Sequence, residues 1–519
     1  MRIAECLIES KKAIPILPLV IQANHIIFIP VSGLFKYMQL HLGSRFFLGL
    51  CLLFLVPTYF INNKNTHDWG GDFALYIQQA KLISNGQDLT QNHYLFNDEH
   101  NRVGPKVYPV GFSILLLPIY KIFGNDICAF TSLISFFYIL MGILSFIFFK
   151  SRLGQFYALL LVLILFYNPL MLQFKLEVMS EIPFAVFLLL TVLLFDRYRS
   201  NLLWAIGIGI LLGFTVSIRS IGWALLAAIP VFYLLNRKLE SLKNLSVIFG
   251  IGILTALTIN QIFIGNAAGS GYTMLFDNYN FLETFYTNLE HSFMIFEIFF
   301  GGKETHVLYL IVLLEAAGLV FALIGIINKI ATKTLDYADL VYLGSMILIL
   351  VFPYSTVVGI RYTIPIFPFL LYYTVLGLAA IDLKVNFSKK FMACLLFLLI
   401  GMVYQPEIAI ILDHNKSKIP GPLSQESIEC FKMIKSDLPE NAVILFQKPR
   451  VLGLYADRDS WSIKKDASQK DLERQKNKFK CSFVLSCKQL VNPAIDRYVA
   501  QHQNKHEVWS NEQFTLIKI

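Results

Sequence analysis

Long apolar segments, separated by short polar connections, dominate the chain up to about residue 412. An apolar stretch of about 20 residues crosses a bilayer as a helix, and about 17 residues is the short end of that range. A shorter apolar segment at 110–123 contains Pro118, and we expect it to lie along the membrane surface or to re-enter it. We predict about eleven membrane-spanning helices, at 45–61, 127–149, 156–172, 179–195, 202–218, 221–235, 246–264, 306–328, 339–357, 363–381 and 391–412.

The pattern changes after residue 412, where apolar positions come in short groups between polar turns. This part predicts a small α/β domain. Its elements are a helix at 424–437, strands at Ala442–Gln447 and Ser482–Ser486, a second helix, and a last strand at Phe514–Ile519. The predicted fold class is therefore an α-helical polytopic membrane protein with a small C-terminal α/β soluble domain. Its parts are a cytoplasmic leader (1–44), a transmembrane domain (45–412) and an extracytoplasmic domain (413–519).

Positive charge along the connections predicts the orientation. With the N-terminus in the cytoplasm, the short inner connections carry twelve Lys and Arg residues. The short connections on the other side carry four, namely Lys175, Arg219, Lys303 and Arg361. Lys and Arg are enriched in cytoplasmic loops, so this asymmetry places two long aromatic-rich loops, 62–126 and 265–305, and the C-terminal domain outside. We expect the protein in the cell (inner or plasma) membrane.

Composition agrees with a membrane protein. Apolar residues make up 56% of the chain and charged residues 15%, with a mean hydropathy of +0.59, whereas soluble domains are about 25% charged. The net charge of +9 is spread over short loops, which excludes a nucleic-acid-binding face. Seven cysteines show neither metal-ligand spacing nor a disulfide framework. Cys481 and Cys487 lie on one predicted strand, roughly 20 Å apart, too far to pair.

The first outer loop carries a candidate catalytic carboxylate. Asp72 precedes apolar residues at helical spacing, which predicts an amphipathic surface helix that starts at Asp72, four positions after Asp68. Two interpretations of Asp72 stay open. It caps the helix, as Asp commonly does, or it serves chemistry at the membrane surface. The same loop ends in an aromatic stretch at Tyr108, which is either an interfacial anchor or part of a site.

Charged residues also border the apolar segments on the outer side. Arg219 and Arg361 stand between pairs of segments with almost no connecting loop, and Lys175, Glu177 and Glu181 form a third group. An arginine near hydrocarbon costs a few kcal/mol and usually has an anionic partner or a function. Snorkelling and mutual ion pairing are the structural alternative. Glu315 lies deep in its apolar segment, where it makes either a structural hydrogen bond or a functional contact.

The sequence resembles the GT-C class of membrane glycosyltransferases, the polyprenyl-phosphate-sugar-dependent type that includes protein O-mannosyltransferases and aminoarabinose transferases. The likeness covers roughly residues 45–382. Many relatives have Asp-Glu in the first loop, whereas Phe73 follows Asp72 here, so the second acidic position is unfilled. Five ordered stretches carry the likeness: Gly71–Tyr76, Tyr108–Phe112, Val178–Pro183, Ile218–Gly222 and Arg361–Pro365.

The resemblance implies an inverting transfer of a sugar from a polyprenyl phosphate to an envelope acceptor hydroxyl at the outer face. Asp72 is then the general base, and the donor phosphate is bound by Arg219 and Arg361, with Lys175 as a further candidate. No cofactor is implied, and a divalent metal stays open. The expected partners are the lipid donor, a lipid, glycan or protein acceptor and the bilayer, without nucleic acid. Further residues expected to position substrate are Asp68, Tyr76, Tyr108, Glu177, Glu181 and Tyr362.

Two other functions remain possible on the sequence alone. A transporter or flippase for a lipid-linked sugar would use the same cations without a base, and a polymerase or ligase would join whole glycans. Transporters often show repeated halves, and this sequence has no such repeat. We expect the C-terminal domain not to be the catalytic unit. Its charged residues read as a solvated turn, namely Asp457, Arg458, Asp459, Lys464, Lys465 and Asp466.

Overall fold

The computed structural model divides the chain into two compact units, residues 1–52 and residues 53–519. In the first unit, β1 (Leu19–Gln22) and β2 (His25–Phe28) form an antiparallel pair. The rest of the predicted leader before residue 45 lies outside the described residues. Those are 19–22, 25–28, 45–61, 66–100, 104–236, 239–265, 279–293, 308–353, 359–380, 389–414 and 421–519.

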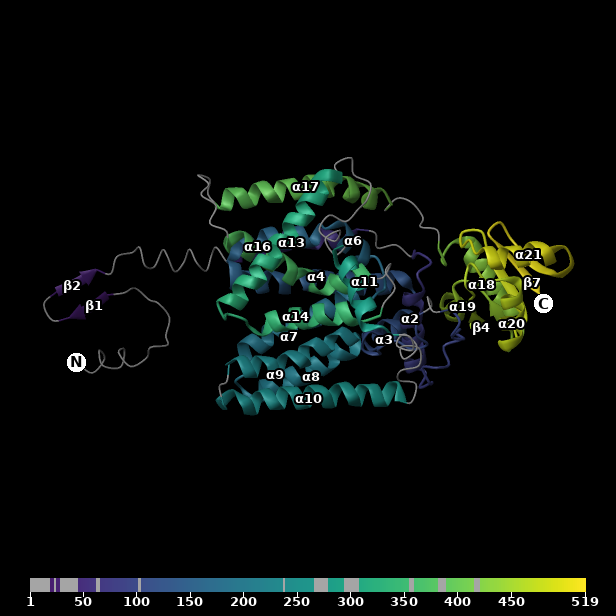
Figure 1. Cartoon of the computed structure of the whole chain (residues 1–519), viewed down its shortest axis with the longest axis horizontal. Helices are drawn as coiled ribbons and strands as arrows, with labels where there is room; N and C mark the ends of the chain where they lie inside the picture. Colours follow the sequence, from purple (N-terminus) through teal and green to yellow (C-terminus); the bar gives the residue numbers. More distant parts are fainter. Residues whose placement is uncertain are drawn as a thin grey trace. The chain divides into compact units, whose positions relative to one another are not determined.

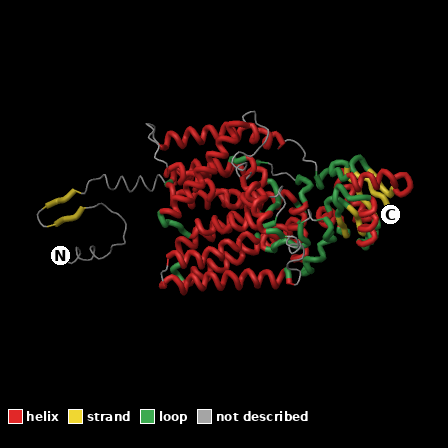
Figure 2. The backbone as a smooth tube through the Cα atoms, in the orientation of Figure 1, coloured by secondary structure: helices red, strands yellow, loops and turns green. Residues whose placement is uncertain are grey.

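Helices make up most of the second unit, and the larger sheet gathers at its C-terminal end (Figures 1 and 2). Within the described residues, each predicted apolar segment of this unit overlaps a helix. The segment at 156–172 is broken into two helices, bent by 63°. The helices are α4 (Ile127–Leu153), α5 (Gln155–Phe166), α6 (Pro169–Lys175), α7 (Glu181–Tyr198), α8 (Leu202–Ile218), α9 (Trp223–Asn236), α10 (Leu239–Phe263), α13 (Leu308–Ala331), α14 (Tyr337–Val351), α16 (Phe367–Ala380) and α17 (Lys389–His414).

Four helical stretches of the described chain are long and apolar enough to cross a membrane, or five if the bent α5–α6 pair is one span. They are Ile127–Leu153, Leu242–Phe263, Arg361–Ala380 and Ala393–Asp413. The other apolar helices are shorter, as α8 with 17 residues illustrates. The count of eleven spans therefore stays a prediction, while the apolar helices themselves are confirmed.

Small residues allow neighbouring apolar helices to approach closely. On α13 and α16, Gly325 and Gly377 face each other's backbone, and a Cβ built on Gly377 would lie 1.7 Å from the carbonyl oxygen of Phe321. Close backbone contact of this kind is how helices associate in an apolar environment, where the hydrophobic effect cannot drive them together. The exposed faces of the outermost helices remain apolar, as Leu254 on α10 and Met402 on α17 show.

The C-terminal domain contains a five-stranded sheet in the order β4-β3-β5-β7-β6. Strand β3 is parallel to β4 and β5, and β7 is antiparallel to β5 and β6. Its core is built around the fully buried Trp461. The elements are α18 (Gln425–Asp437), β3 (Val443–Leu445), α19 (Pro449–Ala456), β4 (Asp459–Trp461), α20 (Gln469–Lys478), β5 (Phe483–Cys487), α21 (Pro493–His506), β6 (Glu507–Ser510) and β7 (Phe514–Lys518).

The α/β nature of this domain and three of its strands match the prediction, and Cys481 and Cys487 are free as expected. The solvated turn at 457–459 is wrong. Arg458 is 6% exposed and donates to the carbonyl oxygens of Lys435 and Leu438. It thereby satisfies carbonyl groups at the end of α18, where no intrahelical donor is available. The charged run at 464–466 is exposed, as predicted.

The first outer loop is docked onto the C-terminal domain. Its backbone extends the sheet beyond the edge strand β4, because Leu95 donates to the carbonyl of Ser460 (2.9 Å) and Ser460 donates to the carbonyl of His93 (2.9 Å). Pairing of this kind covers an edge that would otherwise expose unpaired backbone groups. This contact is what their predicted placement on the same side of the membrane requires, and the side itself stays a prediction.

Trp69 of the first outer loop is buried in an aromatic cage of the C-terminal domain. Its ring lies 6.1–6.3 Å from those of Phe431, Phe446 and Phe514, and its Nε1 donates to Oε1 of Gln489 (2.9 Å). A buried indole with its N–H satisfied contributes a large apolar area at little polar cost. We refer to these three phenylalanines with Gln489 as the Trp69 cage.

Replacing Trp69 by Ala should loosen this docking. A Trp→Ala change in a packed site costs about 3–5 kcal/mol, because the removed atoms leave a cavity. Faster hydrogen–deuterium exchange in β3 and β4 would report the loosening. Trp223→Ala is the control, since this indole is 41% exposed and lies outside the cage. Unchanged exchange in the Trp69 variant would show that the cage does not hold the domain.

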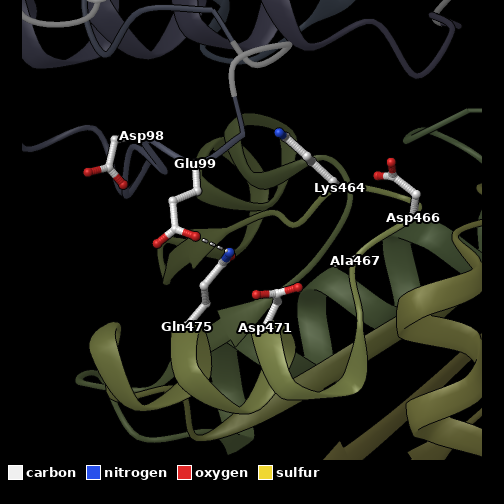
Figure 3. A pocket seen from close by; sticks show the side chains of 7 residues that line it. All are labelled: Asp98, Glu99, Lys464, Asp466, Ala467, Asp471 and Gln475. Carbon is white, nitrogen blue, oxygen red and sulfur yellow. Dashed lines mark hydrogen bonds between the residues drawn. The ribbon is translucent and has the colours of Figure 1, made fainter.

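A cavity of about 470 Å³ opens at the same junction (Figure 3). Acidic side chains of the loop and of the C-terminal domain line it, and Glu99 accepts a hydrogen bond from Gln475 there. Several of these carboxylates already have cationic partners, because Arg474 pairs with Glu99 and Asp471. The lining residues are Asp98, Glu99, Lys464, Asp466, Ala467, Asp471 and Gln475.

Candidate active site

The candidate base lies on α2 (Gly71–Ser84), within the first outer loop. Asp72 stands in the first turn, as predicted, but the helix has no side-chain cap and its N-cap residue is Gly70. The capping interpretation of Asp72 is therefore wrong. The amphipathic surface helix is also wrong, because α2 is buried along most of its length, between α3 (Gly111–Phe123) and α19 of the C-terminal domain.

Both oxygens of Asp72 are occupied by strong donors. Its Oδ2 accepts from Nη1 of Arg361 (2.8 Å), and its Oδ1 accepts from the hydroxyl of Tyr108 (2.8 Å) and from Nη1 of Arg450 (3.0 Å). Hydrogen bonds between ionised partners are about twice as strong as neutral ones. Asp72 and Arg361, which the resemblance assigns to one site, therefore lie 2.8 Å apart.

A second carboxylate, Glu181, joins the two predicted arginines. It is fully buried at the start of α7. Its Oε1 lies 2.9 Å from Nη2 of Arg361, accepts from Nε of the same residue (2.9 Å), and lies 2.9 Å from Nη1 of Arg219. Arg361 therefore bridges Asp72 and Glu181. A planar guanidinium with several fixed donors suits such a bridge, whereas an ammonium does not.

Neighbouring hydroxyls and rings complete the cluster. Arg219 donates to Oγ of Ser180 (2.9 Å), which is also 3.1 Å from the hydroxyl of Tyr76, and its guanidinium lies 5.2 Å from the centre of the Tyr362 ring. Tyr76 in turn stacks on Tyr108 with ring centres 4.9 Å apart. We call this set the Asp72 network: Asp72, Tyr76, Tyr108, Ser180, Glu181, Arg219, Arg361, Tyr362 and Arg450.

Breaks between apolar helices place the two predicted arginines. Arg219 adopts extended backbone between α8 and the 3₁₀ turn Ser220–Gly222. Arg361 lies in the short α15 (Gly359–Thr363), directly before the 3₁₀ turn Ile364–Ile366, which contains Pro365. Proline favours such helix starts because it lacks a backbone N–H. The interruptions bring both guanidiniums to the ends of apolar helices, where their carboxylate partners offset the cost of burial.

Arg361 and Arg450 also set the proton affinity of Asp72. Burial alone would raise the pKa of Asp72, but the positive charges of Arg361 and Arg450, with hydrogen bonds from Arg361 and Tyr108, lower it to about 2. Asp72 is therefore ionised at every physiological pH. This carboxylate binds a proton weakly as long as both guanidiniums remain in contact with it.

Three predicted site residues do not join the network among the described residues. Asp68 has a side chain 58% exposed and accepts from the backbone of Gly70 (2.8 Å). Lys175 is fully buried, and its ammonium donates to the carbonyl of Ile61 (2.5 Å). Glu177 makes no hydrogen bond to the network in the described part of the chain. The side chain of Glu315 and most of the second outer loop lie outside the described residues.

Glu177 nevertheless has an unusual environment, which predicts a pH effect on stability. Burial and, next, the negative charge of Asp68 raise the pKa of Glu177 to about 7. Its ordinary pKa is about 4.3, so the folded chain holds this proton more strongly than the unfolded chain. Stability contributed by the protonated form is therefore lost as the pH rises between these two values.

We expect Glu177→Gln to unfold at a higher temperature than the wild type at pH 8 and to differ little at pH 4.5. Thermal unfolding in detergent at both pH values measures this difference. Glu440→Gln, at an exposed position of the C-terminal domain, is the control. A difference in unfolding temperature between wild type and Glu177→Gln that shrinks as the pH rises would contradict a raised pKa for Glu177.

Arg450 and Ser180 are the site residues that sequence reasoning missed. Ser180 stands next to Glu181 inside the stretch Val178–Pro183, so the sequence could have predicted that it belongs to the site. Arg450 stands in the C-terminal domain, 378 positions from Asp72, and no spacing or periodicity relates the two. In the described part of the chain, no group of three or more His, Cys, Asp or Glu side chains could hold a metal ion.

No protein-family model matches the chain, and no curated protein matches it at a significant level. Several solved structures match the chain. ArnT from Cupriavidus metallidurans bound to undecaprenyl phosphate superposes with a TM-score of 0.51 at 11% identity, covering 91% of this chain and 97% of that one.

The archaeal oligosaccharyltransferase of Archaeoglobus fulgidus is also similar. Tethered to an acceptor peptide, it gives a TM-score of 0.53 at 13% identity over 88% of this chain and 70% of that one. In complex with an inhibitory peptide and a dolichol-phosphate, it gives 0.50 at 12% identity over 84% and 69%. Both proteins are GT-C glycosyltransferases, and both were solved with a lipid phosphate bound, undecaprenyl phosphate in one and a dolichol-phosphate in the other. The resemblance inferred from the five sequence stretches therefore agrees with the structure: the chain has the fold of the GT-C membrane glycosyltransferases.

Proposed function

We propose that the protein transfers a sugar from a polyprenyl-phosphate donor to an acceptor hydroxyl, with Asp72 as the general base. The observation that carries this proposal is the bridge formed by Arg361 between Asp72 and Glu181. It brings a carboxylate and a phosphate-binding guanidinium within 2.8 Å of each other, from segments 289 positions apart. A general base next to cations for the leaving group is what phosphate-activated glycosyl transfer requires.

The charges of the network favour a donor with one phosphate. Three guanidiniums, those of Arg219, Arg361 and Arg450, face the two carboxylates of Asp72 and Glu181. One positive charge is left over. A sugar joined to a lipid through one phosphate is a phosphodiester with a single negative charge, so its binding neutralises the site. A diphosphate-linked donor would leave an excess of negative charge there.

Binding of the donor would also make Asp72 a better base. A general base works best with a pKa near the working pH, whereas the pKa of Asp72 is about 2 while both arginines contact it. A phosphate that draws Arg361 away from Oδ2 removes the largest lowering influence and raises the pKa of Asp72. The carboxylate then gains basicity only when the donor is in place.

The chemical step follows from this arrangement. The acceptor hydroxyl passes its proton to Asp72 while its oxygen forms a bond to the anomeric carbon. The bond between that carbon and the phosphate oxygen breaks, and the phosphate leaves with the electron pair, stabilised by Arg361 and Arg219. Attack in line with the departing phosphate inverts the anomeric centre. Positioning of this kind contributes strongly, because it replaces a bimolecular encounter.

Transfer in reconstituted vesicles tests the proposal. The purified chain would be given a panel of radiolabelled polyprenyl-phosphate sugars, and release of polyprenyl phosphate would be followed with added lipid, glycan and peptide acceptors. We expect turnover with at least one monophosphate donor and none with its diphosphate-linked counterpart. Movement of an intact lipid-linked sugar across the vesicle membrane, without release of lipid phosphate, would instead favour the transporter alternative.

A further inference from the structure

We propose that the C-terminal domain is a working part of this active site, because its Arg450 positions Asp72 for catalysis. This inference rests on the proposed function. It goes beyond the expectation that the domain is not itself the catalytic unit.

Arg450 is held more tightly than a surface ion pair requires. Its side chain is 5% exposed, and its guanidinium makes three hydrogen bonds, from Nη1 to Asp72 (3.0 Å) and Tyr108 (2.9 Å) and from Nη2 to the carbonyl of Pro105 (2.7 Å). It also lies between two rings, 4.9 Å from the centre of Tyr94 and 5.0 Å from that of Tyr108. A planar cation held by both stacking and hydrogen bonds has little freedom to leave.

The first outer loop is shaped to receive this guanidinium. A Cβ built on Gly104 would lie 2.8 Å from Nη2 of Arg450 and 2.7 Å from the hydroxyl of Tyr108, so any larger residue would push both away. Arg450 itself lies in the first turn of α19, after Pro449 at the helix start. Helix α19 packs directly on α2, which carries Asp72.

The surrounding contacts fix the C-terminal domain in register with α2. Trp69, which the cage of the C-terminal domain encloses, lies three residues before Asp72 in the chain. Lys81, in the last turn of α2, pairs with Asp457 (2.5 Å), directly after the end of α19. Ion pairs at such positions add little alone, but together with the cage and the edge pairing they hold α19 against both ends of α2.

This geometry gives the two oxygens of Asp72 different tasks. Oδ2 is held by Arg361, which the donor phosphate recruits, whereas Oδ1 is held by Arg450 and Tyr108 of the docked domain. When the phosphate takes Arg361, Arg450 still orients the carboxylate and keeps it ionised. Oδ2 is then free to accept the proton of the acceptor hydroxyl. Arg450 thus determines which oxygen acts as the base.

The test uses the full-length protein in nanodiscs, with the donor sugar on which the wild type turns over. Misplacing a catalytic group by about 1 Å costs about 10²-fold in rate, so we expect Arg450→Ala to lower kcat by about that factor. Binding of undecaprenyl phosphate, measured directly, should change less than about threefold, because Arg361 and Arg219 remain. Arg450→Lys should not restore kcat, since an ammonium cannot replace the planar fork.

Chemical rescue separates positioning from a merely structural role. The space left between Tyr94 and Tyr108 in Arg450→Ala matches a free planar cation, so millimolar ethylguanidinium should restore part of kcat and ethylammonium should not. Lys81→Ala, which removes a docking ion pair without touching Asp72, is the matched control. Any loss of activity in that variant should not respond to ethylguanidinium.

Three outcomes would overturn the inference. They are a fully active Arg450→Ala variant, a loss of activity that ethylguanidinium fails to rescue in a folded variant, or a rise in the dissociation constant of undecaprenyl phosphate that accounts for the whole loss. The last would make Arg450 a phosphate ligand. Failure of the proposed function looks different, because Asp72→Asn would then remain active whatever Arg450 does.

Discussion

Asp72→Asn is expected to lower kcat for sugar transfer by about 10²- to 10⁴-fold, the usual contribution of a general base. The amide keeps the size of the carboxylate, and its one oxygen can still accept from Tyr108 and Arg450, but its NH2 group neither accepts from Arg361 nor takes up a proton at neutral pH. The measurement is single-turnover release of polyprenyl phosphate from the donor that the wild type uses. Thermal unfolding of the same preparations checks that the variant is folded.

The same variant should bind lipid phosphate at least as tightly as the wild type. In the wild type, the phosphate must compete with Asp72 for Arg361. Removing the charge of Asp72 removes this competition, so the dissociation constant of undecaprenyl phosphate should fall or stay constant while kcat collapses. This combination separates lost catalysis from lost binding.

A matched control exists in the same outer loop. Asp126 is exposed and caps α4 by accepting from the backbone of Cys128 (2.8 Å), a task that asparagine performs equally well. Asp126→Asn should therefore keep both activity and stability. If Asp72→Asn kept more than about a tenth of the wild-type kcat, the base would lie elsewhere.

The sequence was most informative where residues act through local pattern. A continuous apolar segment is most favourably buried in the protein or embedded in lipid as a helix, so the apolar helices were predictable. Arg219 and Arg361 were conspicuous because each interrupts such a segment, and a cation near hydrocarbon needs a reason. That reason proved to be shared, since Glu181 pairs with both.

Features that depend on contacts between distant parts of the chain could not be predicted from the sequence. Strand β4 is short and polar at its start, and it exists because β3 pairs on one side and the first outer loop on the other. Arg450 looks like an ordinary surface residue in the sequence and is buried only because the domain docks on α2. Lys175 is a different case. It was selected as a phosphate ligand from its position outside an apolar segment, but its ammonium contacts the carbonyl of Ile61.

Arg361→Gln is expected to weaken binding of undecaprenyl phosphate by about 10- to 10²-fold, since a hydrogen bond to a charged group contributes about 1.5–3 kcal/mol. It should also lower kcat, because Arg361 stabilises the charge that develops on the leaving phosphate. Arg361→Lys should be nearly as defective. One ammonium cannot reach Asp72 and Glu181 at once, whereas Nη1, Nε and Nη2 of the guanidinium do.

Loss of stability could imitate these effects, because removing one partner of a buried ion pair costs about 3–5 kcal/mol. The double variant Arg361→Gln with Glu181→Gln separates the two causes. It removes the cation together with one of its carboxylate partners, so the thermal unfolding midpoint should recover by the part of the loss that the uncompensated charge of Glu181 causes, while Arg219 loses the same carboxylate but keeps its hydrogen bond to Ser180. Binding of undecaprenyl phosphate should stay weak, because the cation that the phosphate needs is still missing. Arg197→Gln, at an exposed position in the last turn of α7, should change neither property. Recovery of lipid-phosphate binding in the double variant would show that Arg361 serves only to neutralise Glu181, and the phosphate site would then have to be sought at Arg219.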